Sequence, residues 1–300
     1  MSVDGIAAQR KRGGLKAIRS FLELIKFEHT VFALPFAYLG MLLAAKGLPT
    51  LWQFVWITLA MVAARTLAMA ANRIADRWWD ARNPRTAQRP LVTGVISMRT
   101  TWIGTGIAAL GLILCAAMLG PLPLMLLPFA SVFLVGYSFT KRYTSLSHFL
   151  LGFTDGLAVA GAWVAVRGSL FSAADLPAWL LVLTVTLWIG GFDLIYACQD
   201  IEFDRKYGLH SIPAERGSAF ALNLSAVAHF TTLIVLFELG LITRLGWPYW
   251  AALVVTAGLL VYEHALVKPD DFTKLNVAFF NINSYIAITL LVGVLAALLI

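Results

Sequence analysis

The sequence predicts an all-α protein that crosses a membrane about nine times. Of its 300 residues, 60% are hydrophobic and only 13% are charged, whereas soluble domains carry roughly 25% charged residues. Long stretches such as 178–190 and 250–262 contain no ionised side chain. Apolar stretches that approach about 20 residues are typical of spanning helices. We therefore expect a polytopic helical bundle embedded in the lipid bilayer.

Nine apolar runs follow one another along the chain, separated by charged residues, glycine and proline. They cover residues 20–45, 50–74, 98–118, 122–140, 148–167, 177–198, 216–238, 246–266 and 275–299. Each run is close to the ~20 residues that a helix needs to cross the hydrocarbon core. We expect residues 1–19 to form a cytoplasmic tail and residues 20–300 to form one transmembrane domain.

Lys and Arg are distributed unequally among the segments that join these runs. One set of alternate segments holds most of them, namely the N-terminal tail, 73–99, 141–142, 205–216 and 268–274. The other set holds only Lys46, Arg167 and Arg244. Because cytoplasmic loops are the richer in Lys and Arg, nine spans would place the N-terminus in the cytoplasm, at the inner membrane if the organism is bacterial. The formal charge of +7 then reflects topology and implies no nucleic-acid partner.

A short acidic motif occurs twice. Asp76-Arg-Trp-Trp-Asp80 follows the second run, and Asp200-Ile-Glu-Phe-Asp204 follows the sixth. Four predicted helices lie between the copies, and an even number returns the chain to the same side of the membrane. Internal repeats often hold a site between them. We therefore expect an internal repeat whose two motifs meet across one cavity on the cytoplasmic side.

The spacing within each copy suits metal binding. Asn72, Asp76 and Asp80 are four residues apart, which places them along one helix face. The second copy repeats this spacing, with Tyr196 in place of the asparagine. Hard oxygen ligands favour Mg²⁺, which takes its remaining ligands from water and substrate phosphates. A single such motif at a helix end is explained equally well by solvation, but two copies in register predict a magnesium-bridged diphosphate.

Two basic residues are candidates to bind that diphosphate. Arg89 lies nine residues after Asp80, and a guanidinium can bind phosphate oxygens with two parallel bonds. Lys141 follows Tyr137 by four residues at another predicted cytoplasmic helix end, so the two share a face. The positive-inside rule also places cations in such loops. For Lys141 that topological explanation stays open.

Arg65 and Asp193 lie inside apolar runs, where a charge is costly unless it is paired. Arg65 is seven residues before Asn72, and Asp193 is seven residues before Asp200. One explanation is that the two side chains simply pair with each other. The alternative, which we favour, is that Arg65 holds a substrate carboxylate while Asp193 orients or polarises a substrate hydroxyl.

These motifs resemble those of the UbiA superfamily of intramembrane prenyltransferases. The resemblance rests on Asn72-x3-Asp76-x3-Asp80 with Arg85-Thr86 and Arg89-Pro90-Leu91, on Asp193-x2-Tyr196-x3-Asp200-x3-Asp204, and on Tyr137-x3-Lys141-Arg142. It covers nearly the whole chain, from residues 26–35 to the run that contains Phe280. It implies a nine-helix fold around a central cavity that opens to the cytoplasm and laterally to lipid.

The resemblance also implies a reaction. A polyprenyl group would pass from polyprenyl diphosphate to the ring of an aromatic acid such as 4-hydroxybenzoate, with Mg²⁺ as cofactor, in ubiquinone biosynthesis. The implied metal ligands are Asn72, Asp76, Asp80, Asp200 and Asp204. Arg89 and Lys141 would bind phosphate, and Arg65 and Asp193 would face the acceptor. Tyr137 and Tyr196 would shelter a cationic prenyl group, and no obligate protein partner is implied.

Three alternatives remain from the sequence. The first is a different acceptor, a hydroxynaphthoate of menaquinone biosynthesis, which no motif here separates from 4-hydroxybenzoate. An ion-coupled transporter also has intramembrane carboxylates and repeats, although its aspartates should lie near the middle of the membrane and not at helix ends beside arginines. The third is a phosphatase or terpene-forming activity on the prenyl diphosphate alone, which would leave Arg65 with no substrate carboxylate to bind.

Overall fold

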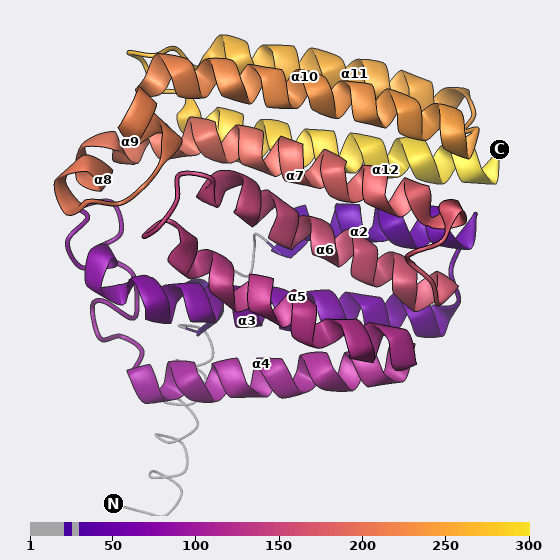
Figure 1. Cartoon of the computed structure of the whole chain (residues 1–300), viewed down its shortest axis with the longest axis horizontal. Coiled ribbons are helices and arrows are strands. Elements are labelled where there is room, and N and C mark those ends of the chain that lie inside the picture. Colours follow the sequence, from indigo (N-terminus) through magenta and orange to yellow (C-terminus); the bar gives the residue numbers. More distant parts are fainter. Residues whose placement is uncertain (1–20, 26–29) are drawn as a thin grey trace, which may run out of the picture.

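The computed structural model describes residues 21–25 and 30–300, with the side chains of 30–33 left aside. Helices make up most of this part of the chain, and no β-strand forms in it (Figure 1). The α-helices are α2 (Thr30–Ala45), α3 (Leu51–Asp80), α4 (Met98–Leu119), α5 (Pro121–Thr140), α6 (Ser147–Arg167), α7 (Leu176–Ala197), α8 (Ile201–Tyr207), α9 (Ile212–Arg216), α10 (Ser218–Thr243), α11 (Trp247–Leu266) and α12 (Asn283–Leu299). A π-helical turn, Val277–Ile282, leads into α12. The expected tail, 1–19, lies outside the described residues.

Eight helical segments of the described chain are long and apolar enough to cross a membrane. They correspond to the second to ninth predicted runs, which confirms an all-α, multi-pass membrane protein. The first predicted run is described only in part, and there the apolar helix Leu34–Ala45 is shorter than a full span. Large apolar side chains such as Ile107, Leu110 and Val254 are exposed on the outer surface. Lipid, not water, suits such a surface.

The long helices lie alongside one another and form the bundle of Figure 1. There α4 lies at one edge, while α10 and α11 lie at the opposite edge. Between them α7 packs against α6 and α10, α2 packs against α6, and α3 packs against α4. The short helices α8 and α9 lie at one end of the bundle, the end at which α3 finishes. Both aspartate motifs are therefore at the same end.

Local sequence signals explain where several helices begin. Thr50 caps α3, because its hydroxyl accepts a bond from Gln53 N at 3.2 Å while the Gln53 side chain accepts one from Thr50 N at 3.0 Å. Gly120 joins α4 directly to α5 with φ of 129°, a conformation open to glycine. Pro121 then starts α5, where a missing N–H costs nothing. The apolar runs on either side of Gly120 thus form a tight helical hairpin.

The two motifs differ in their backbone. The first lies on one continuous helix, since α3 runs on beyond the apolar run 50–74 to Asp80, as the predicted common helix face requires. In the second, α7 ends at Ala197, a 3₁₀ turn covers Cys198–Asp200, and α8 starts at Ile201. The identical spacing therefore predicted a single helix face that exists only in the first copy. Asp200 therefore ends the 3₁₀ turn, whereas Asp204 lies within α8.

Candidate functional site

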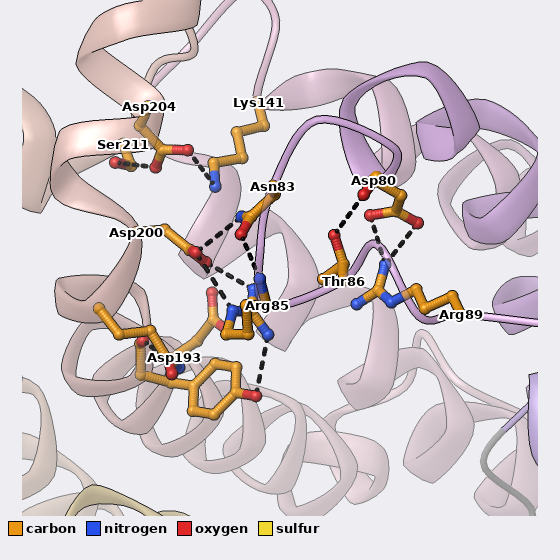
Figure 2. A network of polar contacts seen from close by, with 12 residues as sticks. Asp80, Asn83, Arg85, Thr86, Arg89, Lys141, Asp193, Asp200, Asp204 and Ser211 are labelled. Carbon is orange, nitrogen blue, oxygen red and sulfur yellow. Dashed lines mark hydrogen bonds and ion pairs between the residues drawn. The ribbon is translucent and has the colours of Figure 1, made fainter. Parts of the chain in front are cut away.

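A polar cavity of about 260 Å³ lies between the two aspartate motifs. Ten of the eleven site residues predicted from the sequence line it: Asn72, Asp76, Asp80, Arg89, Tyr137, Lys141, Asp193, Tyr196, Asp200 and Asp204. They come from α3, the loop 81–97, α5, α7 and the segment around α8. Figure 2 shows how the polar side chains converge there. The two motifs, which are 120 residues apart in the sequence, thus line one shared cavity.

The first motif is held in a chain of polar contacts along α3. Asn72 donates from Nδ2 to Asp76 Oδ2 at 3.0 Å, and Arg142 approaches Asp76 Oδ1 at 3.5 Å. One turn further on, Arg89 Nη1 lies 2.6 Å from both carboxylate oxygens of Asp80. Thr86 secures the loop that carries Arg89, because its hydroxyl donates to the Asp80 carbonyl at 3.1 Å (Figure 2). Each carboxylate therefore has a guanidinium beside it.

Asp200 of the second motif is bound by the loop 81–97, which follows the first motif. Arg85 donates to its two oxygens at 2.6 and 3.2 Å, and Asn83 Nδ2 donates at 3.0 Å. Arg85 also donates to the Tyr196 hydroxyl at 3.1 Å. Burial acts to lower the pKa of the Arg85 guanidinium, but its bonds to Asp200 outweigh burial and raise that pKa above the usual value. This loop therefore ties the two motifs together.

Asp204 has a different pair of partners. Lys141 Nζ lies 2.9 Å from Asp204 Oδ1, and the Ser211 hydroxyl donates to Oδ2 at 2.7 Å. Lys141 immediately follows the last residue of α5, and its own carbonyl accepts the His210 backbone N–H at 2.8 Å. The sequence placed Arg89 and Lys141 on substrate phosphates. In the structure they contact Asp80 and Asp204 at the wall of the cavity where such phosphates would lie.

The donor set fits a hard divalent cation. All four motif aspartates offer carboxylate oxygens to one cavity, and Asn72 adds an amide oxygen. Within the described residues no group of three or more His, Cys, Asp or Glu side chains is close enough to hold a metal ion by itself. That arrangement suits Mg²⁺, which is usually bound by one or two carboxylates and completes its shell with water and substrate phosphates. A metal here would replace the cations that now contact the carboxylates.

A second, larger cavity of about 1290 Å³ continues from the polar one. The residues that line both are Asn72, Arg85, Thr86, Arg89, Tyr137, Leu151, Asp193 and Tyr196. The remaining wall is mainly apolar and comes from α3, α4, α5, α6 and α7. The site therefore joins a charged compartment to a long apolar one, which suits a ligand with an anionic head and a hydrocarbon tail.

Arg65 lines the apolar cavity and lies two turns of α3 before Asn72, on the same helix face. Its Nε is buried without a hydrogen-bond partner, and its charge acts on the nearby Asp155 and Tyr137. No ion pair within 4.0 Å joins it to Asp193 in the described chain, so the simple pairing of those two residues is wrong. Asp193 instead bonds to His148, whose Nδ1 lies 2.7 Å from Asp193 Oδ2. Arg65 thus has unused hydrogen-bonding capacity and lies on the wall of the apolar cavity.

Four residues that contact the site aspartates were not predicted as site residues from the sequence. Asn83 carries no pattern of its own, and Arg85 and Arg142 were assigned to topology or only to a family motif. His148 gave no signal, because it begins a predicted helix among apolar neighbours. The folding of the loop 81–97, the path of the chain between α5 and α6, and the crossing of α6 with α7 bring these side chains to the carboxylates.

Comparisons with known proteins agree with this geometry. A model of the UbiA prenyltransferase family matches residues 33–285. The chain is 32% identical over 263 residues to a 4-hydroxybenzoate octaprenyltransferase of Pseudoalteromonas translucida, with 86% of each chain covered. A solved UbiA homologue from Aeropyrum pernix K1 in its apo form is 35% identical, with a TM-score of 0.82 over 90% of this chain and 98% of that one.

A more distant structure shares the fold. A UbiA homologue from Archaeoglobus fulgidus, bound to DMAPP and Mg²⁺, is 18% identical with a TM-score of 0.68, over 92% of this chain and 99% of that one.

Proposed function

Because the chain belongs to the UbiA prenyltransferase family, we propose that it transfers a polyprenyl group from polyprenyl diphosphate to the ring of an aromatic acid. The observation that carries the proposal is the union of two compartments, one lined by paired aspartates and cations and one apolar. Relatives named 4-hydroxybenzoate octaprenyltransferase support it. Those names support a 4-hydroxybenzoate-like acceptor, and with it we propose a role in ubiquinone biosynthesis.

The diphosphate occupies the polar cavity in this proposal. Asn72, Asp76, Asp80, Asp200 and Asp204 hold Mg²⁺, a choice supported by the distant homologue that was solved with DMAPP and Mg²⁺. When bound there, Mg²⁺ would supply positive charge that stabilises the diphosphate as a leaving group. Arg85, Arg89 and Lys141, released from their carboxylates, bind phosphate oxygens. Their charge favours the departed diphosphate over the intact ester, which is where stabilisation accelerates the reaction.

The prenyl chain extends into the apolar cavity. When the allylic C–O bond breaks, positive charge develops on the carbon at the junction of the two cavities. The rings of Tyr137 and Tyr196 line that junction and favour a cation by attraction to their π faces. The apolar wall excludes water that would otherwise capture the cation.

The aromatic acid binds beside Arg65. A guanidinium with an unpaired, buried Nε gains a partner when it receives a carboxylate. That contact orients the ring so that a carbon next to the hydroxyl meets the electrophile. Nothing on the wall distinguishes a benzene ring from a naphthalene ring, so a hydroxynaphthoate of menaquinone biosynthesis is the competing acceptor. In the proposed topology the polar cavity opens to the cytoplasm, at the inner membrane of a bacterium.

The test uses the purified enzyme in detergent with Mg²⁺, a short prenyl diphosphate and a panel of hydroxybenzoates and hydroxynaphthoates. We expect a prenylated aromatic product by mass spectrometry, and no product after the metal is removed with a chelator. Asp76→Ala should abolish turnover, whereas Arg65→Ala should mainly raise the KM for the acceptor. If no acid in the panel is prenylated, the proposal is wrong. If Arg65→Ala leaves that KM unchanged, the carboxylate role alone is wrong.

A further inference from the structure

Asp193 differs from the four motif aspartates in the kind of partner it has. Arg142, Arg89, Arg85 and Lys141 contact the motif aspartates, whereas Asp193 Oδ2 lies 2.7 Å from Nδ1 of His148. A guanidinium can only donate hydrogen bonds, whereas a neutral imidazole has one nitrogen that donates and one that accepts. The His148–Asp193 contact therefore differs in kind from the carboxylate–cation contacts at the phosphate end of the site.

The backbone holds the two side chains at this distance. His148 lies in the first turn of α6, and Asp193 lies near the end of α7. The two helices cross with very little space between them, because a Cβ on Gly152 would overlap the Thr186 backbone and a Cβ on Gly190 would overlap the Phe149 ring. Glycine at such a crossing brings helix backbones together in membrane proteins. The His148–Asp193 contact is thus fixed by helix packing.

Only one of the two residues is accessible to a substrate. The Asp193 side chain is 24% exposed, whereas that of His148 is 3% exposed. Asp193 lines both cavities, and His148 lines the polar one. Since a carboxylate can only accept, Nδ1 carries the proton and donates it to Asp193. His148 Nε2 is then a buried acceptor, and it has no hydrogen-bond partner. The buried His148 thus holds the more exposed Asp193 carboxylate in place.

Asp193 is also better placed than the other acidic residue of the apolar cavity. Asp155 lines only the apolar compartment, where the charge of Arg65 acts on it. The carbon that loses diphosphate must lie where the two compartments meet, and the attacking ring carbon must lie against it. Asp193 is on the wall of that junction, so its carboxylate can reach a proton on the ring or on the adjacent hydroxyl.

We propose that His148 is a positioning residue for proton removal, holding the Asp193 carboxylate as the acceptor of the proton that the aromatic substrate loses. The inference rests on the proposed prenyl transfer. The ring carbon forms its bond to the prenyl carbon as the allylic C–O bond breaks, and the C–O electrons leave with the diphosphate. The C–H bond of the same ring carbon then breaks, its electrons restore the aromatic ring, and the proton passes to Asp193.

The experiment compares His148→Ala and His148→Asn in steady-state turnover with Mg²⁺, using ordinary and ring-deuterated acceptor. The asparagine keeps an N–H close to the position of Nδ1, whereas alanine removes it. We expect His148→Ala to lower kcat about 10-fold or more, since positioned proton transfer contributes roughly 10²- to 10⁴-fold. The KM for prenyl diphosphate should hardly change. A deuterium isotope effect should appear or grow in His148→Ala, because proton loss becomes slow, and His148→Asn should retain most of the kcat.

A matched control is His229→Asn. His229 is equally buried and bonds to His264 and to the Trp188 carbonyl, but it lines neither cavity, so turnover should stay near that of the unmodified enzyme.

The inference fails if His148→Ala keeps full kcat, if its kcat falls without a larger isotope effect, or if His148→Asn is as slow as His148→Ala. If His148→Ala does not fold, Asp193→Asn takes its place and must lose turnover while it still binds prenyl diphosphate. A failure of the unmodified enzyme to prenylate any acid would instead overturn the proposed function.

Discussion

At the scale of single residues, the charged compartment is a balance between carboxylates and the cations that contact them. Arg85 holds Asp200 with two bonds, so a metal ion would have to displace this guanidinium from the carboxylate. We expect Arg85→Ala to lower the Mg²⁺ concentration needed for half-maximal turnover, because Asp200 is released. It should also lower kcat about 10-fold or more, because a charge that stabilises the leaving diphosphate is lost.

The control for this prediction is Arg82→Ala. Arg82 is in the same loop, but its guanidinium stacks on the Trp78 ring and bonds to the Trp78 carbonyl, away from the aspartates. Titration of turnover with Mg²⁺ should give the same curve for Arg82→Ala and for the unmodified enzyme. A rise in the Mg²⁺ requirement of Arg85→Ala would show that Arg85 organises the metal ligands and does not compete with the metal.

At the scale of elements, the site depends on the close crossing of α6 and α7. A Cβ on Gly152 would overlap the Thr186 backbone, which cannot move aside as a flexible side chain can. We expect Gly152→Ala to destabilise the protein by about 1–3 kcal/mol, the usual cost of overpacking. Thermal unfolding in detergent should show a lower midpoint. Gly106→Ala on α4 is the control, because nothing lies within 4 Å of that Cβ, and an unchanged midpoint for Gly152→Ala would contradict the argument.

The elements also show how far sequence reasoning reaches. Spans two to nine were predicted because each needs only an apolar run of sufficient length, which composition reveals. The spacing of Asn72, Asp76 and Asp80 correctly predicted a common helix face, since α3 is continuous through them. The same spacing failed for Asp200 and Asp204, where a 3₁₀ turn interrupts the helix. Local spacing carries no information about that break.

The cations of the site illustrate the same limit. Arg89 and Lys141 were placed at the aspartate site because they lie close in sequence to a motif or to a helix end. Arg85 and His148 were not, because each contacts an aspartate far along the chain: Asp200 is 115 positions after Arg85, and Asp193 is 45 positions after His148. Such contacts depend on how a loop folds and on how two helices cross, and neither is encoded in a local pattern.

At the scale of the whole molecule, the depth of the apolar cavity should set the length of the prenyl donor. Gly161 of α6 lies on its wall, and a Cβ there would meet nothing within 4 Å. It is 13 residues beyond His148 on the same helix, or about 20 Å at 1.5 Å per residue. A large side chain at this position therefore fills space far from the charged compartment.

We expect Gly161→Phe to accept short prenyl diphosphates as well as the unmodified enzyme does and to lose turnover progressively with longer ones. Short chains end before the blocked region, whereas long chains must enter it and would overlap the new ring. A series of donors of increasing length, with products identified by mass, measures the change. Gly106→Phe is the control, since Gly106 is exposed on α4 and lines neither cavity, so its length profile should stay unchanged. An unaltered profile for Gly161→Phe would mean that the prenyl tail leaves the bundle laterally into lipid before it reaches this depth.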